Sequence, residues 1–166
     1  MKETPTELPQ GEAKVAAVRS MFDTIAPRYD RVNRLLTFGM DAGWRRRTVA
    51  SLGLSPRSVV LDIAAGTGDL CRELEARGHF GVGVDMAFGM LAHARTSSPL
   101  VQADALALPV PDGVVDGLTC GFALRNFVDL RGFLLESARV VRPGGRIALL
   151  EVAEPVNPVL RAGHGV

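Results

Sequence analysis

The chain has 166 residues, of which 47% are hydrophobic, and a formal net charge of +1. This length suits one domain that buries roughly two-thirds of its unfolded surface, and it is too short for two full domains. The near-neutral charge argues against nucleic acid as a partner, because phosphate binding requires a basic stripe. No apolar stretch approaches the ~18–20 residues that cross a bilayer, and the first residues lack the apolar core of a signal peptide, so we expect a soluble, cytoplasmic protein.

The N-terminal third predicts a leader and two helices. Residues 1–11 are polar and contain two prolines, which is typical of a disordered leader. From residue 12 to residue 26 apolar side chains recur every three or four positions, as in an amphipathic helix, and Pro27 ends this pattern. A second helical stretch follows and ends at Gly53. These helices either pack against the rest of the domain or form an apolar lid over the reactive end of a cofactor.

Three consecutive basic residues, Arg45, Arg46 and Arg47, lie in the second helical stretch. A solvated helix face explains such a run. The alternative is an electrostatic foothold on an anionic membrane surface.

Residues 59–69, VVLDIAAGTGD, combine a short apolar run with a loop of small residues. The run at 59–63 is rich in β-branched residues and suits a parallel strand that is buried on both faces. The loop at 64–68 has almost no side chains, so a ligand can contact its backbone. A helix is predicted over 69–78, and together these elements form the first half of a doubly wound α/β sheet, whose ligands bind at the carboxyl ends of the strands.

The pattern of glycines indicates which cofactor the loop binds. A dinucleotide fingerprint has a third glycine for close helix packing beside the pyrophosphate, and Cys71 occupies that position. The loop therefore fits a ligand without a pyrophosphate, such as S-adenosylmethionine. A turn of this kind also occurs for packing alone, which is the alternative. The predicted cofactor contacts in this segment are Asp62, Gly66, Thr67 and Gly68.

A second apolar strand, 81–85, ends in Asp85, 17 residues beyond Gly68. A carboxylate at this position can accept both hydroxyl groups of a ribose. The same aspartate could instead cap the next predicted helix, 87–95. We include Asp85 and its neighbour Met86 among the candidate cofactor contacts.

Two further strands are predicted at 99–102 and 115–122. Asp104 follows the first of them and can accept a hydrogen bond from the exocyclic amine of adenine, while Ala105 leaves room for the ring. The second ends in small residues, where the sulfur of a methyl donor would lie. Three strand ends therefore bring acids to one edge of one sheet.

Cys71 and Cys120 fall on a predicted helix and a predicted strand without paired spacing, which indicates buried thiols rather than a disulfide. The three histidines, His79, His93 and His164, are scattered. We therefore expect no metal site.

The remaining chain predicts a helix over 129–141, a turn over 142–146 and a fifth strand over 147–152. We divide the chain into a leader at 1–11, a helical lid at 12–53, a Rossmann-like cofactor-binding domain at 54–154 and a tail at 155–166.

Several motifs match a known family. They are FDTIAPRYD at 22–30, FALRN at 122–126 and RVVRPGGR at 139–146. With them the chain resembles the S-adenosylmethionine-dependent C-methyltransferases of menaquinone and ubiquinone biosynthesis, the UbiE/MenG type. The resemblance extends from about Phe22 to Glu151.

The resemblance implies a class I S-adenosylmethionine-dependent methyltransferase fold, a doubly wound Rossmann-like sheet. It also implies C-methylation of a prenylated hydroquinone, demethylmenaquinol. The cofactor contacts that it implies are Thr67, Asp85, Asp104, Ala105 and Gly121.

Candidate catalytic residues are Asp41, Tyr29 and Arg125. Asp41 stands where the family usually has a histidine, so a proton-transfer role of that histidine is in doubt here. Asp41 and Tyr29 are candidate bases, and Arg125 could stabilise a phenolate oxygen. Each has a structural alternative, since Asp41 could cap a helix and Arg125 could serve in a salt bridge.

Members of the family continue through two more strands that complete a seven-stranded sheet, so we expect this chain to be part of a longer protein. The fifth strand would then be an exposed apolar edge that favours association, including homo-oligomers. Peripheral contact with the inner membrane face is a further expectation. The alternative functions are methylation of another small aromatic or lipid, and cofactor binding without catalysis.

Overall fold

The structure is a computed structural model that describes residues 11–29, 35, 37 and 39–152. The predicted tail, almost all of the predicted leader and part of the second helical stretch lie outside the described residues.

Five parallel strands form one sheet with the order β3-β2-β1-β4-β5. β1 lies in the centre, as its continuous apolar sequence predicts, and pairs with β2 on one side and β4 on the other. The strands are β1 (Val59–Ile63), β2 (Phe80–Asp85), β3 (Leu100–Gln102), β4 (Val115–Gly121) and β5 (Val141–Leu150).

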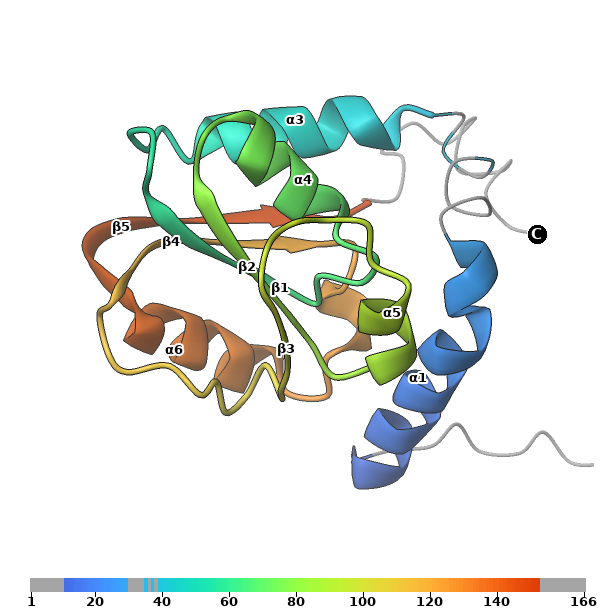
Figure 1. The fold of residues 1–166 in the computed structure, drawn as a ribbon. Helices are drawn as coiled ribbons and strands as arrows, with labels where there is room; N and C mark the ends of the chain where they lie inside the picture. Colours follow the sequence, from blue (N-terminus) through green and yellow to red (C-terminus); the bar gives the residue numbers. More distant parts are fainter. Residues whose placement is uncertain (1–10, 30–34, 36, 38, 153–166) are drawn as a thin grey trace, which may run out of the picture.

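Helices cover both faces of the sheet (Figure 1). Figure 1 shows α3 and α4 on one face, α6 on the other, and α1 beside α5 near the end at which the strands finish. The helical elements are α1 (Gly11–Ile25), η1 (Ala26–Arg28), α3 (Asp41–Ser51), α4 (Asp69–Ala76), α5 (Phe88–Ala92), η2 (Leu124–Asn126) and α6 (Leu130–Val140).

The hydrophobic core has a part on each side of the sheet. Phe133 and Val140 of α6 are fully buried in one cluster with strand residues such as Leu118. On the other side Leu52, which follows α3, packs in a cluster with Leu74 of α4. The two layers hold the sheet rigidly between them, so the loops at the ends of its strands are held in fixed positions.

One prediction about the C-terminal part is wrong. The segment 142–146, which we predicted to be a turn, belongs to β5, and the predicted strand at 147–152 is its second half. Val115 of β4 pairs with Val141, whereas Gly117 pairs with Arg146, so the register shifts within this segment. A β-bulge therefore accommodates the glycine-rich residues that the sequence marked as a turn.

β5 lies at the edge of the described sheet, and its side chains Ile147 and Leu149 are each 39% exposed. This agrees with the expected apolar edge. The predicted helix at 87–95 is shorter in the structure, where α5 ends at Ala92.

We predict that Gly83→Ala destabilises the fold. An added Cβ would lie 2.7 Å from Leu100 Cδ2 and 3.1 Å from both Ala65 Cβ and Cys71 Sγ. Overpacking of this kind costs about 1–3 kcal/mol of the free energy of unfolding, which urea denaturation measures. The matched control is Gly43→Ala in α3, where the nearest atom is 4.0 Å away. Because alanine is the better helix former, the control should be as stable as the wild type or up to about 1 kcal/mol more stable, and equal losses in both variants would contradict the prediction.

Candidate functional site

The carboxylate of Asp85 ties the glycine loop to the next strand. Its Oδ2 atom accepts a hydrogen bond of 2.8 Å from the Gly66 amide, and its Oδ1 atom accepts one of 2.8 Å from the Ala87 amide. Burial raises the pKa of Asp85 above its ordinary value, although these backbone hydrogen bonds act in the opposite direction. The carboxylate therefore fixes both the loop after β1 and the turn after β2.

Both glycines of the loop adopt left-handed backbone conformations, with φ of +56° at Gly66 and +82° at Gly68. A Cβ at Gly68 would also lie 2.8 Å from Thr96 Cγ2, so packing contributes to the requirement for glycine at this position. The preceding Ala64 has φ of +55° without being glycine. Strain of this kind is common in backbone that is shaped for a ligand.

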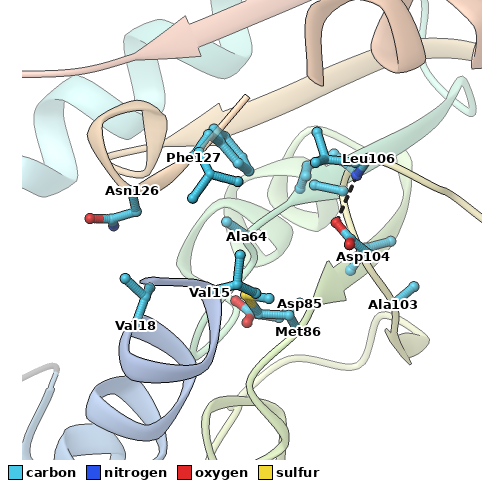
Figure 2. Close-up of a pocket in the computed structure, with 14 residues that line it drawn as sticks. Val15, Val18, Ala64, Asp85, Met86, Ala103, Asp104, Leu106, Asn126 and Phe127 are labelled. Carbon is cyan, nitrogen blue, oxygen red and sulfur yellow. Dashed lines mark hydrogen bonds between the residues drawn. The ribbon is translucent and has the colours of Figure 1, made fainter. Parts of the chain in front are cut away.

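A cavity lies at the carboxyl ends of β1, β2 and β3 (Figure 2). We call it the α1 cavity, because Val15 and Val18 of α1 form one of its walls (Figure 2). The remaining lining comes from the ends of the strands and from η2 and the residues that follow it. The predicted site residues among its lining are Asp85, Met86, Asp104 and Ala105.

Asp104 has one carboxylate oxygen available to a ligand. Its Oδ1 atom accepts a 2.9 Å hydrogen bond from the Leu106 amide, which closes a turn just after β3 (Figure 2). The side chain belongs to an exposed residue that lines the α1 cavity. A carboxylate has about four lone-pair sites, so Asp104 can accept further hydrogen bonds from a bound group.

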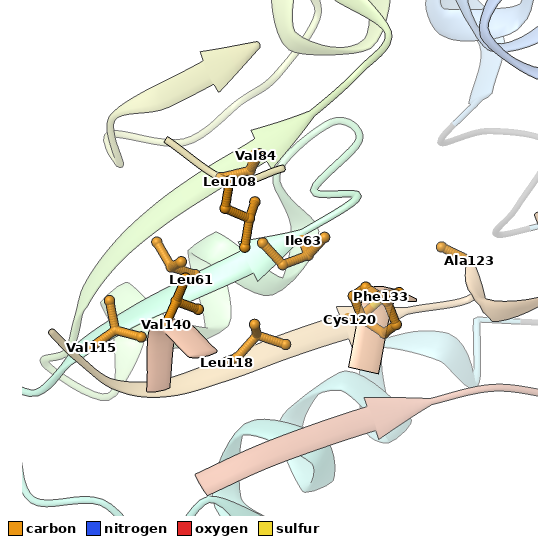
Figure 3. Packing of buried hydrophobic residues seen from close by; sticks show 10 residues of the cluster. All are labelled: Leu61, Ile63, Val84, Leu108, Val115, Leu118, Cys120, Ala123, Phe133 and Val140. Carbon is orange, nitrogen blue, oxygen red and sulfur yellow. The ribbon is translucent and has the colours of Figure 1, made fainter. Parts of the chain in front are cut away.

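The floor of the α1 cavity is part of the hydrophobic core. Ile63 and Val84 line the cavity and also belong to the buried cluster of Figure 3. Both side chains are almost completely buried, at 0% and 2% exposure. A ligand in this cavity would therefore lie on a close-packed surface that cannot yield without disturbing the core.

A second cavity lies on the other side of Ala64, which lines both cavities. We call it the loop cavity, because the glycine loop forms much of its wall. Its lining includes the predicted residues Tyr29, Asp62, Gly66, Thr67 and Gly121. Asp62 is thus separated from Asp85 and Asp104, which line the α1 cavity, but the shared Ala64 makes the two cavities neighbours.

Asp62 is 1% exposed and is held by two side chains. The Thr119 hydroxyl donates a 2.8 Å hydrogen bond to its Oδ1 atom, and Cys71 Sγ lies 3.5 Å from its Oδ2 atom. Burial raises the pKa of Asp62 to about 7, against the opposing effect of these two hydrogen bonds. The carboxyl group therefore changes its charge near neutral pH.

Both cysteines are free and buried, as predicted. Burial is the main cause that raises the pKa of each thiol, and the nearby charge of Asp62 raises both further. Neither Cys71 nor Cys120 is therefore a reactive thiolate.

Arg45 connects α3 to the loop cavity. Its guanidinium forms ion pairs with Asp41 and, at 2.8 Å, with Asp69 of α4. It also lies 5.5 Å from the centre of the Phe122 ring. Only 7% of the residue is exposed, so Arg45 is not part of a basic surface, and the exposed members of the arginine run are Arg46 and Arg47.

The three candidate catalytic residues have different environments. Burial acts to raise the pKa of Asp41, but hydrogen bonds from Thr37 and Arg45 outweigh it and lower the pKa below its ordinary value. Burial raises the pKa of Tyr29, which lines the loop cavity. Arg125 is largely exposed, at 62% of its side chain, and lies 3.5 Å from Glu151. Because its pKa is lowered, Asp41 is poorly suited to accept a proton.

Sequence reasoning did not indicate many of the residues that line the two cavities, and five of them show why. Val15 and Val18 appeared only as members of an amphipathic face, and the spacing does not tell whether such a face meets core or cavity. Phe127 and Phe122 follow strand β4, where the sequence drew attention to the small residues instead. Arg45 was part of a charge run.

Within residues 11–29, 35, 37 and 39–152, no cluster of three or more His, Cys, Asp or Glu side chains could hold a metal ion. In that same part of the chain no helix is both long enough and apolar enough to span a membrane.

The sequence matches a family model described as the ubiE/COQ5 methyltransferase family over residues 10–165. The demethylmenaquinone methyltransferase of Corynebacterium urealyticum is 44% identical over 142 residues, which cover 85% of this chain and 62% of that protein. The enzyme of the same name from Mycolicibacterium gilvum is 48% identical over 141 residues, which cover 84% of this chain and 62% of that protein. The chain therefore spans less than two-thirds of the length of these relatives.

A solved structure of Haemonchus contortus phosphoethanolamine N-methyltransferase 1, in complex with phosphoethanolamine and S-adenosylhomocysteine, has a TM-score of 0.72 with this chain. It is 20% identical, and the match covers 90% of this chain and 34% of that one. At this identity the match shows the fold alone. The predicted fold class, the class I S-adenosylmethionine-dependent methyltransferase fold with a Rossmann-like parallel sheet, is confirmed.

We predict that Asp62→Asn becomes more stable relative to the wild type as the pH rises. The folded-state pKa of about 7 lies above the ordinary value of 3.8, so the contribution of Asp62 is complete below the lower value and is lost as the pH rises through the higher one. Across this window the stability difference should shift by about 4 kcal/mol in favour of the uncharged asparagine. Urea denaturation of both proteins from about pH 4 to 8 measures this shift.

The control is Ser137→Ala, which removes a buried hydroxyl that donates to the Phe133 carbonyl and carries no charge. Its stability difference from the wild type should not change across the same range. If the Asp62→Asn curve instead runs parallel to the wild-type curve, Asp62 does not titrate as the structure indicates.

Proposed function

Because the chain belongs to the ubiE/COQ5 methyltransferase family, we propose that it binds S-adenosylmethionine and takes part in methylating a ring carbon of a prenylated hydroquinone, demethylmenaquinol. The observation that carries this proposal is the pair of neighbouring cavities at the strand ends, one lined by Asp85 and Asp104 and the other by Asp62. S-adenosylmethionine would supply the methyl group as an electrophile bound to a sulfonium.

The α1 cavity fits the adenosyl part of this donor. Asp85 lies between the glycine loop and the cavity. Its carboxylate can accept hydrogen bonds from the ribose hydroxyl groups in addition to its two hydrogen bonds from the backbone. Asp104 accepts from the Leu106 amide with one oxygen, which leaves the other to accept from the adenine amine. Met86 and Ala105 then provide apolar contact for the ring.

The loop cavity fits the amino-acid end. The acids Asp62 and Asp69 line it, and either can attract the ammonium group. Arg45 lines it as well and can attract the carboxylate. Gly66 and Thr67 of the glycine loop line the loop cavity, Ala64 lines both cavities, and Gly68 lines neither, so the first part of the loop would orient the molecule that joins them.

The methyl acceptor would lie near Tyr29 and Phe122, beyond the end of β4. A hydroxyl of the acceptor ring would give its proton to solvent, and the resulting phenolate would make the adjacent carbon nucleophilic. As this carbon bonds to the methyl group, the methyl–sulfur bond would break with its electron pair going to sulfur, and the hydrogen of the ring carbon would return to the oxygen as a proton. A cation and an anion then combine into neutral products, so bulk water would oppose the step by stabilising the reactants. The Trp44–Phe122 pair, with ring centres 6.3 Å apart, supplies aromatic surface beside the loop cavity and would help to exclude water from the acceptor end.

Among the catalytic candidates we assign Tyr29 to hydrogen bonding with the acceptor hydroxyl, since it lines the loop cavity. Arg125 is assigned to stabilise the phenolate oxygen. Asp41 is paired with Arg45, so we assign it to hold that arginine in position. A cytoplasmic location with peripheral contact at the inner membrane face is part of the proposal, with Arg46 and Arg47 as its exposed basic residues.

The proposal is tested with S-adenosylmethionine labelled in its methyl group and a short-chain demethylmenaquinol. We expect S-adenosylhomocysteine to bind the chain in a calorimetric titration, and the label to appear on a ring carbon of the quinol. Label on oxygen alone contradicts C-methylation. Transfer to another aromatic or lipid instead supports the broader methyltransferase alternative.

Binding without transfer to any acceptor supports a catalytically silent cofactor-binding chain. Affinity for NAD in the absence of affinity for S-adenosylhomocysteine contradicts the proposal and supports a dinucleotide site. Dimers or larger assemblies in native mass spectrometry would support the expected association through β5.

We predict that Asp104→Asn changes which purine the α1 cavity prefers. The asparagine can keep its Oδ1 bond to the Leu106 amide, but it then presents an NH₂ group where the wild type presents an acceptor. Affinity for 5′-methylthioadenosine should fall about tenfold, and affinity for 5′-methylthioinosine, which has an oxygen in place of the amine, should rise. Calorimetric titration of both ligands measures the reversal.

Asp85→Asn is the matched comparison, because it changes the same type of side chain at the ribose end of the cavity. This substitution should lower the affinity for both ligands by a similar factor and should not change which of the two binds more tightly. Equal losses for the two purines in Asp104→Asn would show that Asp104 does not contact the base.

A further inference from the structure

The two ends of α1 have different surroundings. At its C-terminal end Phe22 packs with Ala26, Ala87 and Met90 in a small apolar cluster. At its N-terminal end Val15 and Val18 line the α1 cavity (Figure 2). The helix is thus anchored at one end and forms a wall of the cavity at the other.

Asp23 makes the polar contact of the anchored end. Its Oδ1 atom accepts a 2.7 Å hydrogen bond from the Gly89 amide of α5. Gly89 lies in the first turn of α5, where backbone amides have no acceptor within the helix. Arg19, one turn earlier in α1, lies 4.0 Å from the other oxygen of Asp23.

The same contact is sterically tight. A Cβ at Gly89 would lie 2.9 Å from Asp23 Oδ1, 3.0 Å from Asp23 Cα and 3.1 Å from the Asp23 carbonyl oxygen. Two of these atoms belong to the backbone of α1, so a side chain at position 89 would displace the helix itself. Glycine is therefore required at 89 for α1 to approach α5 this closely.

A small movement of α1 at its contact with Gly89 produces a larger displacement at the other end of the helix. Val15 precedes Asp23 by eight residues, or about 12 Å along a helix. A small rotation at Asp23 therefore moves Val15, and with it this part of the cavity lining, by a larger amount.

We infer that Val15 and Val18 form a wall of the adenosyl site, and that the contact between Asp23 and Gly89 holds this wall in place. Asp23 is then a positioning residue for cofactor binding, although it does not itself line the α1 cavity. This inference rests on the proposed function, because it takes the α1 cavity to be the adenosyl site. The wall contacts the nucleoside, so its position should matter equally for any ligand that carries the adenosyl group.

The test compares S-adenosylhomocysteine with 5′-methylthioadenosine, which has the adenosyl group but no amino-acid end. We expect Asp23→Ala and Gly89→Ala to lower the binding affinity for both ligands by the same factor, about three- to tenfold, in calorimetric titrations. Asp23→Asn keeps an oxygen that accepts from the Gly89 amide and should bind within about twofold of the wild type. The matched control for Gly89→Ala is Gly43→Ala, which should bind both ligands as the wild type does.

Trypsin cleavage after Lys14 and Arg19, both within α1, provides a second measurement. Bound 5′-methylthioadenosine should slow this cleavage in the wild type and slow it less in Asp23→Ala. This measurement reports on the wall directly and does not depend on catalysis. Circular dichroism spectra that match the wild type show that the variants are folded.

Unchanged affinity in both Asp23→Ala and Gly89→Ala overturns the inference while leaving the proposed function intact. A loss confined to S-adenosylhomocysteine also overturns it, because the contact would then act on the amino-acid end. A wild-type chain that binds neither ligand overturns the proposed function, and the inference with it.

Discussion

The carboxylate of Asp85 joins the glycine loop after β1 to the turn after β2 at the edge of a cavity. It accepts hydrogen bonds from the backbone amides of Gly66 and Ala87, and it lines the cavity at the strand ends. The glycine loop has few side chains of its own, so the bond from Gly66 to Asp85, together with backbone bonds such as that from Ala65 to Val84, holds the loop across the ends of β1 and β2. The division into an α1 cavity and a loop cavity follows from the position of that loop. A substitution at Asp85 therefore alters both cavities at once.

The loop cavity contains charged side chains of both signs. The loop cavity combines a deeply buried acid, Asp62, with the Arg45 guanidinium, whose charge is balanced by Asp41 and Asp69. The pKa of Asp62 is raised to about 7 by burial, and a cation bound beside the carboxylate would lower it again. A positively charged ligand would thus ionise its own binding residue. This arrangement suits a ligand that carries both an ammonium and a sulfonium group.

The central strand and the acids that follow the strands could be predicted from sequence, because an apolar run followed by a loop of small residues has few other structural explanations. This reasoning indicated Asp85 and Asp104, which the structure places in one cavity. It did not indicate Val15 or Arg45, since an amphipathic face or a charge run has the same sequence pattern whether it meets solvent, core or a cavity. The turn predicted at 142–146 became a bulge for a related reason: the glycines signal a local bend but not whether strand pairing continues beyond it.

The sheet provides a fold that is shared with other methyltransferases, whereas the N-terminal elements supply side chains to both cavities. The fold of the sheet is shared with a phosphoethanolamine N-methyltransferase that is only 20% identical, so the sheet alone does not determine the methyl acceptor. Residues from α1 to α3 contribute to both cavities, with Val15 and Val18 at one and Tyr29 and Arg45 at the other. Polar contacts hold this segment to the sheet domain in addition to apolar packing, among them Asp23 with Gly89 and Arg45 with Asp69. The first of these contacts lies near the α1 wall of one cavity and the second is formed by two residues that line the other, so the N-terminal segment shapes both ends of the proposed donor site.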